Sequence, residues 1–171
     1  MSEIETDRLR LRRLDAADAP FILELLNEPS FLRFIGDKGV RTLDDARAYI
    51  AQQISSYETI GFGLYLTERK QDGAPIGICG LVKRASLDDV DVGFAFLPAF
   101  WLQGYAVESA SAVVVHAIAV LKLPRVVAIT NPDNVGSITV LNKIGLRFHR
   151  TTKLSAGGPD LNLFSTADRT A

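Results

Sequence analysis

The sequence predicts a protein of the α/β class, of the α+β kind, with one mixed sheet covered by helices on both faces. Two observations lead to this prediction. The apolar patterns follow the order strand, two helices, three strands, helix, strand, helix and two strands. The three strands in the middle are joined by short connections, which is typical of an antiparallel meander. Together these patterns fit a layered sheet-and-helix domain.

The first elements are predicted from alternation and from helix-start residues. Residues 9–14 alternate apolar and charged side chains, as a half-buried strand does. Asp15 can cap a helix that runs to about residue 27 and carries its apolar side chains on one face. Residues 31–40 are expected to form a loop, because two glycines interrupt the segment.

The middle of the chain combines a capped helix with the meander. Thr42 and Asp45 resemble a capping box, with Asp in place of Glu, and open a helix that reaches about residue 59. Strands are predicted at residues 62–68 and 75–84, on either side of a Gln-Asp-Gly turn. A third strand follows at residues 90–97.

The last third of the chain alternates helices and strands. A long apolar helix begins at Gly104 and is followed by a strand at residues 125–130. Asn134 is a favourable N-cap for a compact helix over residues 135–144, which Gly145 ends. Two further strands are predicted, at residues 146–154 and 161–165, and the tail from Thr166 is expected to fray.

Composition limits the classes of protein to which the chain can belong. Its 171 residues fit one domain over residues 1–171, and a net charge of −1 gives no basic field for nucleic acid or an anionic membrane. The apolar stretch 106–121 is too short and too polar to span a membrane. The N-terminus lacks a signal pattern, so we expect a cytoplasmic protein. One cysteine and two histidines supply neither an internal disulfide nor a metal site.

The strongest functional signal is the loop that leads into the long helix. Backbone N–H groups at a helix N-terminus have no intrahelical partners and attract anions, and Gly104 allows close approach to the backbone. The sequence contains neither the G-x-x-x-x-G-K-[ST] nor the G-x-G-x-x-G pattern. The loop therefore predicts a phosphate-bearing ligand that is neither a P-loop nucleotide nor a Rossmann dinucleotide.

Five segments in order give the chain a family resemblance. Residues 101–108, 131–137 and 141–148, supported by residues 5–12 and 76–81, resemble the GNAT acetyltransferases. The closer resemblance is to the RimJ/RimL branch, the ribosomal-protein N-terminal acetyltransferases, and it extends over almost the whole chain. It implies a mostly antiparallel sheet of about six or seven strands, splayed between two central strands and flanked by about four helices.

The resemblance also implies a cofactor and its binding residues. Acetyl-CoA, as acyl donor, would lie where the parallel strands 91–97 and 125–130 part. Its diphosphate would meet backbone N–H groups at the start of the long helix, and its pantetheine amides would meet strand backbone and an asparagine side chain. The expected cofactor-binding residues are Phe96, Leu97, Gln103, Gly104, Tyr105, Ala106, Val107, Asn134 and Ser137. No metal is implied.

Two side chains are candidates for catalysis. By analogy with the family, Ser137 lies nearest the CoA sulfur and could protonate the leaving thiolate, because many members carry a tyrosine where this chain has Leu141. Alternatively, Ser137 only satisfies backbone groups in the first helical turn. Asp91 could remove a proton from the attacking amine through a water molecule. The alternative is an outward-facing Asp91 paired with Lys83 or Arg84.

The resemblance implies an acyl-CoA-dependent N-acyltransferase that moves an acetyl group to a primary amine by direct attack. The acceptor would be a protein N-terminus or a small-molecule amine, and a homodimer is compatible with the family. Two alternatives stay open. The acyl donor could be succinyl-CoA, for which Arg33 or Arg41 could supply the cation, or the protein could be a CoA-binding sensor or partner module without turnover.

Overall fold

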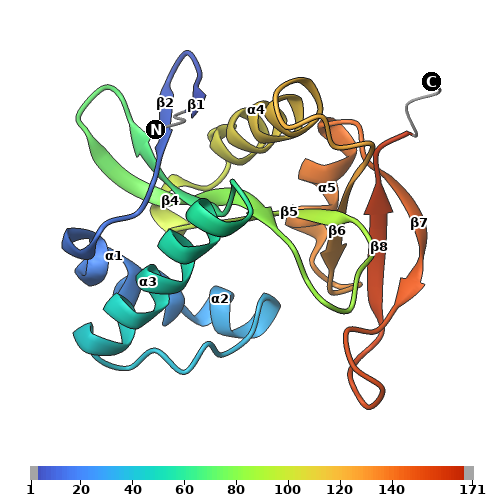
Figure 1. The fold of residues 1–171 in the computed structure, drawn as a ribbon, viewed down its shortest axis with the longest axis horizontal. Helices are drawn as coiled ribbons and strands as arrows, with labels where there is room; N and C mark the ends of the chain where they lie inside the picture. Colours follow the sequence, from blue (N-terminus) through green and yellow to red (C-terminus); the bar gives the residue numbers. More distant parts are fainter. Residues whose placement is uncertain (1–3, 168–171) are drawn as a thin grey trace.

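The structure, a computed structural model, describes residues 4–167 as one sheet with helices on both sides (Figure 1). The strands are β1 (Ile4–Glu5), β2 (Leu9–Arg12), β3 (Leu64–Arg69), β4 (Ala74–Val82), β5 (Val90–Phe96), β6 (Val126–Thr130), β7 (Arg147–Thr152) and β8 (Leu161–Ser165). The helices are α1 (Ala19–Leu26), α2 (Pro29–Phe34), α3 (Leu43–Thr59), α4 (Tyr105–Ala119) and α5 (Val135–Lys143), with short 3-10 helices η1 (Ala16–Asp18) and η2 (Pro98–Phe100).

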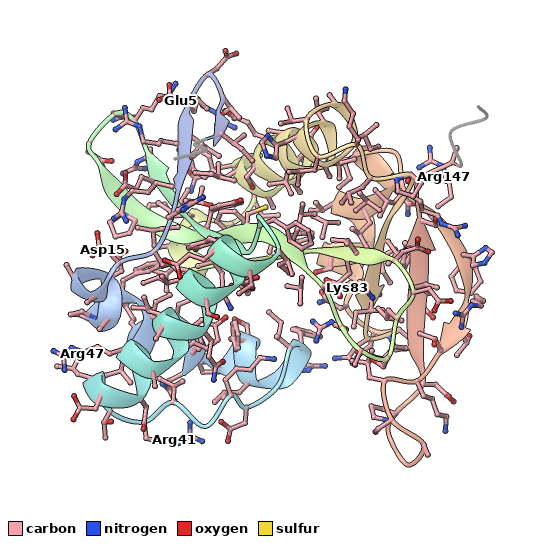
Figure 2. All side chains as sticks on the ribbon, in the orientation of Figure 1. Glu5, Asp15, Arg41, Arg47, Lys83 and Arg147 are labelled. Carbon is pink, nitrogen blue, oxygen red and sulfur yellow. The ribbon has the colours of Figure 1, made fainter. Side chains whose placement is uncertain are left out.

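The sheet has the strand order β1-β2-β3-β4-β5-β6-β8-β7. Every neighbouring pair is antiparallel except β5 and β6, which are parallel because α4 carries the chain back between them. Figure 2 shows how far the sheet extends, with Glu5 at the hairpin of β1 and β2 and Arg147 at the start of β7, on the other side of the molecule. The predicted mixed and mostly antiparallel sheet is confirmed.

Two apolar layers hold the helices on the sheet. On one face, α1 and α3 pack against Leu66 of β3 and Ile78 of β4. On the other face, α4 and α5 pack against Cys79 and Leu81 of β4. Neighbouring residues of β4 thus serve opposite layers, as the alternation of side chains along a strand requires. Figure 1 shows α1, α2 and α3 grouped on one side of the sheet and α4 with α5 on the other.

The predicted N-cap of α3 is confirmed, whereas the N-cap predicted for α1 belongs to a short 3-10 helix that precedes it. Thr42 and Asp45 form a reciprocal capping box at the start of α3, each side chain accepting the other's backbone N–H at 3.1 Å. Asp15 also caps, but it caps η1, and α1 begins only at Ala19. Asp18 explains the shift, because its side chain accepts the Asp15 N–H at 2.9 Å and also pairs with Arg12.

Two elements, α2 and β1, were not predicted from the sequence. The expected loop over residues 31–40 is wrong at its start, since α2 covers Pro29–Phe34. Pro29 suits the first turn of a helix and Phe31 is buried, but six residues are too few for the helical period to show. Strand β1 was also missed, because two residues cannot show alternation; it exists through its pairing of Ile4 with Leu11 and Glu5 with Arg10.

Close approach of β3 and β4 gives a test of the fold. A Cβ atom at Gly80 would lie 2.1 Å from the Gly63 carbonyl oxygen and 2.8 Å from the Leu64 Cα. Gly80→Ala should therefore lower the free energy of unfolding by roughly 1–3 kcal/mol, because backbone atoms must move apart. Gly157→Ala is the control, since no atom lies within 4 Å of its Cβ position. Equal denaturant midpoints for the two variants would contradict this packing.

Candidate active site

The site begins where two central strands stop pairing. Strands β5 and β6 are paired only at Val90 with Val126 and at Asp91 with Val127, although β5 continues to Phe96 and β6 to Thr130. Beyond that point β5 is still paired with β4, and β6 with β8. We call the facing, unpaired stretches, residues 92–96 and 128–130, the splay.

Hydrogen-bond direction decides which backbone groups face the splay. The Leu97 N–H donates to the Ile76 carbonyl at 3.0 Å, and the Leu97 carbonyl accepts from the Phe100 N–H at 2.9 Å. Alternate residues of an antiparallel strand direct their N–H and C=O groups to the same neighbour, so Phe94 and Phe96 direct theirs away from β4. Phe96 thus has the expected orientation. The backbone of Leu97 is already bonded, and Phe94, which the sequence analysis missed, faces the splay instead.

The predicted anion loop has the expected helix-start geometry. Gly104 caps α4 in the left-handed region, with φ of 82°. The first helical hydrogen bond joins the Glu108 N–H to the Gly104 carbonyl at 3.0 Å. The N–H groups of Tyr105, Ala106 and Val107 therefore precede the first helical bond and point out of the end of the helix.

A side-chain hydrogen bond joins the same loop to the end of β5. Trp101 donates its indole N–H to the Phe96 carbonyl at 2.8 Å, and the Gln103 amide donates to the Ala99 carbonyl at 3.1 Å. Leu102 is fully exposed and has a positive φ of 60°, a conformation that glycine adopts more readily. The loop thus lies beside the splay with its shape set by side-chain contacts.

A second helix start lies at the end of β6. Asn134 accepts the Ser137 N–H at 3.2 Å, so the predicted cap of α5 is confirmed, and Ser137 is half-buried in the first turn. One turn later, Leu141 is buried in the apolar layer shared with α4. The position that carries a tyrosine in many related proteins is therefore a core position here. Gly145 ends the helix with φ of 95°.

Asp91 lies at the closed end of the splay and is the last residue of β5 that pairs with β6. Its side chain is 2% exposed and accepts a hydrogen bond from Arg84 Nε at 2.6 Å. The outward-facing alternative is therefore wrong, while pairing with Arg84 is confirmed; Lys83 donates to the Leu87 carbonyl instead. Burial raises the pKa of Asp91, and the positive charges of Arg84 and Lys38 oppose that rise.

Helix α2 contacts the segment that follows β6. The Asn131 side chain donates to the Phe34 carbonyl at 2.9 Å, and Arg33 pairs with Asp133 at 3.3 Å. The missed helix thus joins the α1–α3 side of the sheet to the loop before α5. Arg41 pairs with Asp37. The two arginines considered for a succinyl group therefore both have carboxylate partners within the chain.

Two further findings concern residues 4–167. No three His, Cys, Asp or Glu side chains in this range lie together as a metal site requires. No helix in the same range is long and apolar enough to cross a membrane.

Comparison with known proteins identifies the family. Residues 8–147 match the model of the acetyltransferase (GNAT) domain, and the chain belongs to this family. The Bacillus subtilis (strain 168) protein YkkB is 26% identical over 155 residues, with 89% of each chain covered. The N-acetyltransferase YnaD of the same organism is 27% identical over 144 residues, which cover 84% of this chain and 82% of YnaD.

Solved structures show the same fold. RimL, the ribosomal L7/L12 alpha-N-protein acetyltransferase in complex with coenzyme A, superimposes with a TM-score of 0.83 at 18% identity, with 96% of this chain and 97% of that chain covered. The family and the fold together define an acyl-CoA-dependent N-acyltransferase of the GNAT class, which transfers an acetyl group from acetyl-CoA to an amine.

The cap of α5 can be tested separately from activity. Asn134→Ala should lower the free energy of unfolding by about 1 kcal/mol, because the Ser137 N–H loses its acceptor. Asn134→Ser should keep most of that stability, since serine caps nearly as well. Urea denaturation of both variants measures the difference. If alanine and serine were equally stabilising, the cap would contribute nothing.

Proposed function

We propose that acetyl-CoA lies across the splay, with its diphosphate at the N-terminus of α4 and its acetyl group near Asp91 and Ser137. One observation carries this proposal: the unpaired edge of β5 ends beside an open helix N-terminus. An extended ligand can bond to an unpaired strand edge as another strand would. The helix end supplies the N–H groups and the partial positive charge that a diphosphate needs.

The donor-binding residues have distinct roles in this proposal. Backbone N–H groups of the segment from Gln103 to Val107 bind the diphosphate, and Gly104 allows the left-handed backbone that begins the helix there. Phe94, in place of Leu97, offers backbone groups to the pantetheine amides, whereas Phe96 keeps only its N–H for the donor because its carbonyl already accepts from Trp101. Asn134 caps α5 through its side-chain oxygen, which leaves the amide NH₂ to donate to a pantetheine carbonyl.

The chemistry follows from the same placement. The amine nitrogen attacks the thioester carbonyl, and the Phe96 N–H stabilises the oxyanion of the tetrahedral intermediate. Asp91 accepts the proton that the amine loses, through a water molecule, and its raised pKa makes it a stronger base. The C–S bond then breaks, Ser137 donates its proton to the departing thiolate and recovers one from a water molecule, and Asp91 releases its proton to solvent. The products are an amide and CoA.

A peptide N-terminus is the acceptor that we propose first. The fold shared with RimL supports this choice. Two of the three acidic side chains on α3 that could attract a polyamine are already engaged, since Asp44 pairs with Arg47 and Asp45 caps the helix. A small-molecule amine is the second candidate for the acceptor.

Binding of the donor is the first experiment. Trp101 is the only tryptophan and lies at the end of β5, so its fluorescence should change as acetyl-CoA or CoA is titrated. Calorimetry with acetyl-CoA, CoA and succinyl-CoA then ranks the donors. No binding of any of the three would overturn the proposed function. Binding without acetylation of a broad amine panel would instead indicate a CoA-binding sensor.

Ser137 gives a test of catalysis. Ser137→Ala should lower kcat by roughly 100-fold or more, because the leaving thiolate loses its proton donor, while the variant still binds acetyl-CoA. Thr139→Val is the matched control on the same helix, since the Thr139 hydroxyl is exposed and donates to the Val135 carbonyl. Wild-type kcat in Ser137→Ala would leave the serine with a helix-start role only.

Asp91 gives a test through pH. A base must be deprotonated, so kcat/KM should rise with pH through the pKa of Asp91, which lies above the ordinary value for aspartate. Asp91→Asn should remove this step and lower kcat/KM by roughly 100-fold at neutral pH. Asp89→Asn is the control, because Asp89 pairs with Arg125 at 3.0 Å. An unchanged pH profile in Asp91→Asn would exclude Asp91 as the base.

A further inference from the structure

The N-terminal hairpin contacts the first turn of α4 through one carboxylate. The Thr6 hydroxyl donates to Glu108 Oε1 at 2.6 Å, and the backbone N–H of Arg8 donates to the same oxygen at 2.9 Å. Arg8 Nε donates to the other oxygen, Oε2, at 2.7 Å. Both oxygens of Glu108 are therefore bonded to residues about 100 positions away in the sequence.

The same arginine also reaches the loop before the helix. Arg8 Nη1 donates to the Gln103 carbonyl at 2.9 Å, and the guanidinium carbon lies 4.4 Å from the centre of the Tyr105 ring. A Cβ atom at Gly104 would be 3.1 Å from Arg8 Nη2. The Arg8 side chain therefore lies against three consecutive residues of the predicted anion loop.

The hairpin that carries Arg8 is itself held in place. Lys70, in the turn between β3 and β4, donates its backbone N–H to the Arg8 carbonyl at 2.9 Å and its ammonium group to the Thr6 carbonyl at 2.6 Å. Leu9, which follows Arg8 in the chain, is completely buried. Arg8 thus approaches the loop from a fixed backbone, although its side chain is half-exposed.

Glu108 creates an electrostatic conflict at this place. A carboxylate in the first turn of a helix interacts favourably with the helix dipole, but it repels an anionic ligand bound at the same helix end. Burial favours the neutral form of Glu108, yet the hydrogen bonds from Thr6 and Arg8 outweigh it and lower the pKa of this carboxyl. Glu108 is therefore charged at neutral pH, and the positive charge of Arg8 lies beside it, with Nε 2.7 Å from the carboxylate.

We propose that Arg8 is a positioning residue for the acyl donor: it cancels the charge of Glu108 and holds the Gln103–Gly104 segment, so that the N-terminus of α4 can accept the diphosphate. This inference rests on the proposed function. It gives the N-terminal hairpin a role in donor binding, although no residue of that hairpin belongs to the splay.

The decisive experiment asks whether neutralising Glu108 restores the donor binding that Arg8→Ala loses. Arg8→Ala should raise the Kd for acetyl-CoA roughly 10- to 100-fold in calorimetry, because a charged hydrogen-bonding partner is lost and Glu108 is left uncompensated. In the double variant Arg8→Ala/Glu108→Gln, most of that loss should be recovered, since the repelling charge is gone. Glu108→Gln alone should bind nearly as well as wild type.

A truncated donor separates this role from general damage. S-acetylpantetheine has no diphosphate, so Arg8→Ala should leave its kcat/KM unchanged while lowering kcat/KM for acetyl-CoA. Arg10→Ala is the control variant, since Arg10 lies in the same hairpin, on β2, and pairs with Glu5 at 3.3 Å. If Arg8→Ala unfolds, Arg8→Lys, which keeps the charge but loses the forked contact, should show an intermediate Kd.

The outcomes are distinguishable. Wild-type protein that binds neither acetyl-CoA nor CoA overturns both the proposed function and this inference. Wild-type binding together with an unchanged Kd in Arg8→Ala overturns the inference alone. A raised Kd that Glu108→Gln does not recover, or an equal loss with S-acetylpantetheine, shows that Arg8 supports the structure without compensating the charge.

Discussion

The early end of pairing between β5 and β6 is the constraint on which the site depends. Two paired residues on each strand join the β1–β5 part of the sheet to the β6–β8 part. Past that point each strand pairs with another strand only on its outer side, so the inner edges carry N–H and C=O groups without strand partners, of which the Phe96 carbonyl accepts from Trp101. Unpaired backbone groups are costly when buried, and an extended ligand with amides of its own can satisfy them.

Asp91 and Glu108 are each paired with an arginine, but their pKa values shift in opposite directions. Asp91 is buried, so its pKa rises despite Arg84, which would suit the base role that we propose for it. Glu108 is less buried, and hydrogen bonds from Thr6 and Arg8 lower its pKa. Because an anionic donor would be repelled by a free carboxylate, pairing each of them with a cation makes the site compatible with a CoA derivative.

Local sequence patterns were the most reliable guide to the fold. The capping box at Thr42, the cap at Asn134 and the left-handed Gly145 were all predicted, because each depends on residues within one helical turn. Elements too short to show a period, β1 and α2, were missed. The same limit applies to the site: the helix start at Gly104 was predicted from contiguous residues, whereas the contact of α2 with Asn131 was not.

The sequence alone therefore determined the family, the order of the main elements and the helix start at Gly104, because these are encoded in contiguous segments. Only the tertiary structure decided that Phe94 faces the splay in place of Leu97, since pairing with β4 sets the direction of each backbone group. It also decided that Asp91 is buried against Arg84 and that Arg8 reaches Glu108. Such contacts join residues from separate elements, and their distance and burial arise only when the sheet and helices pack together.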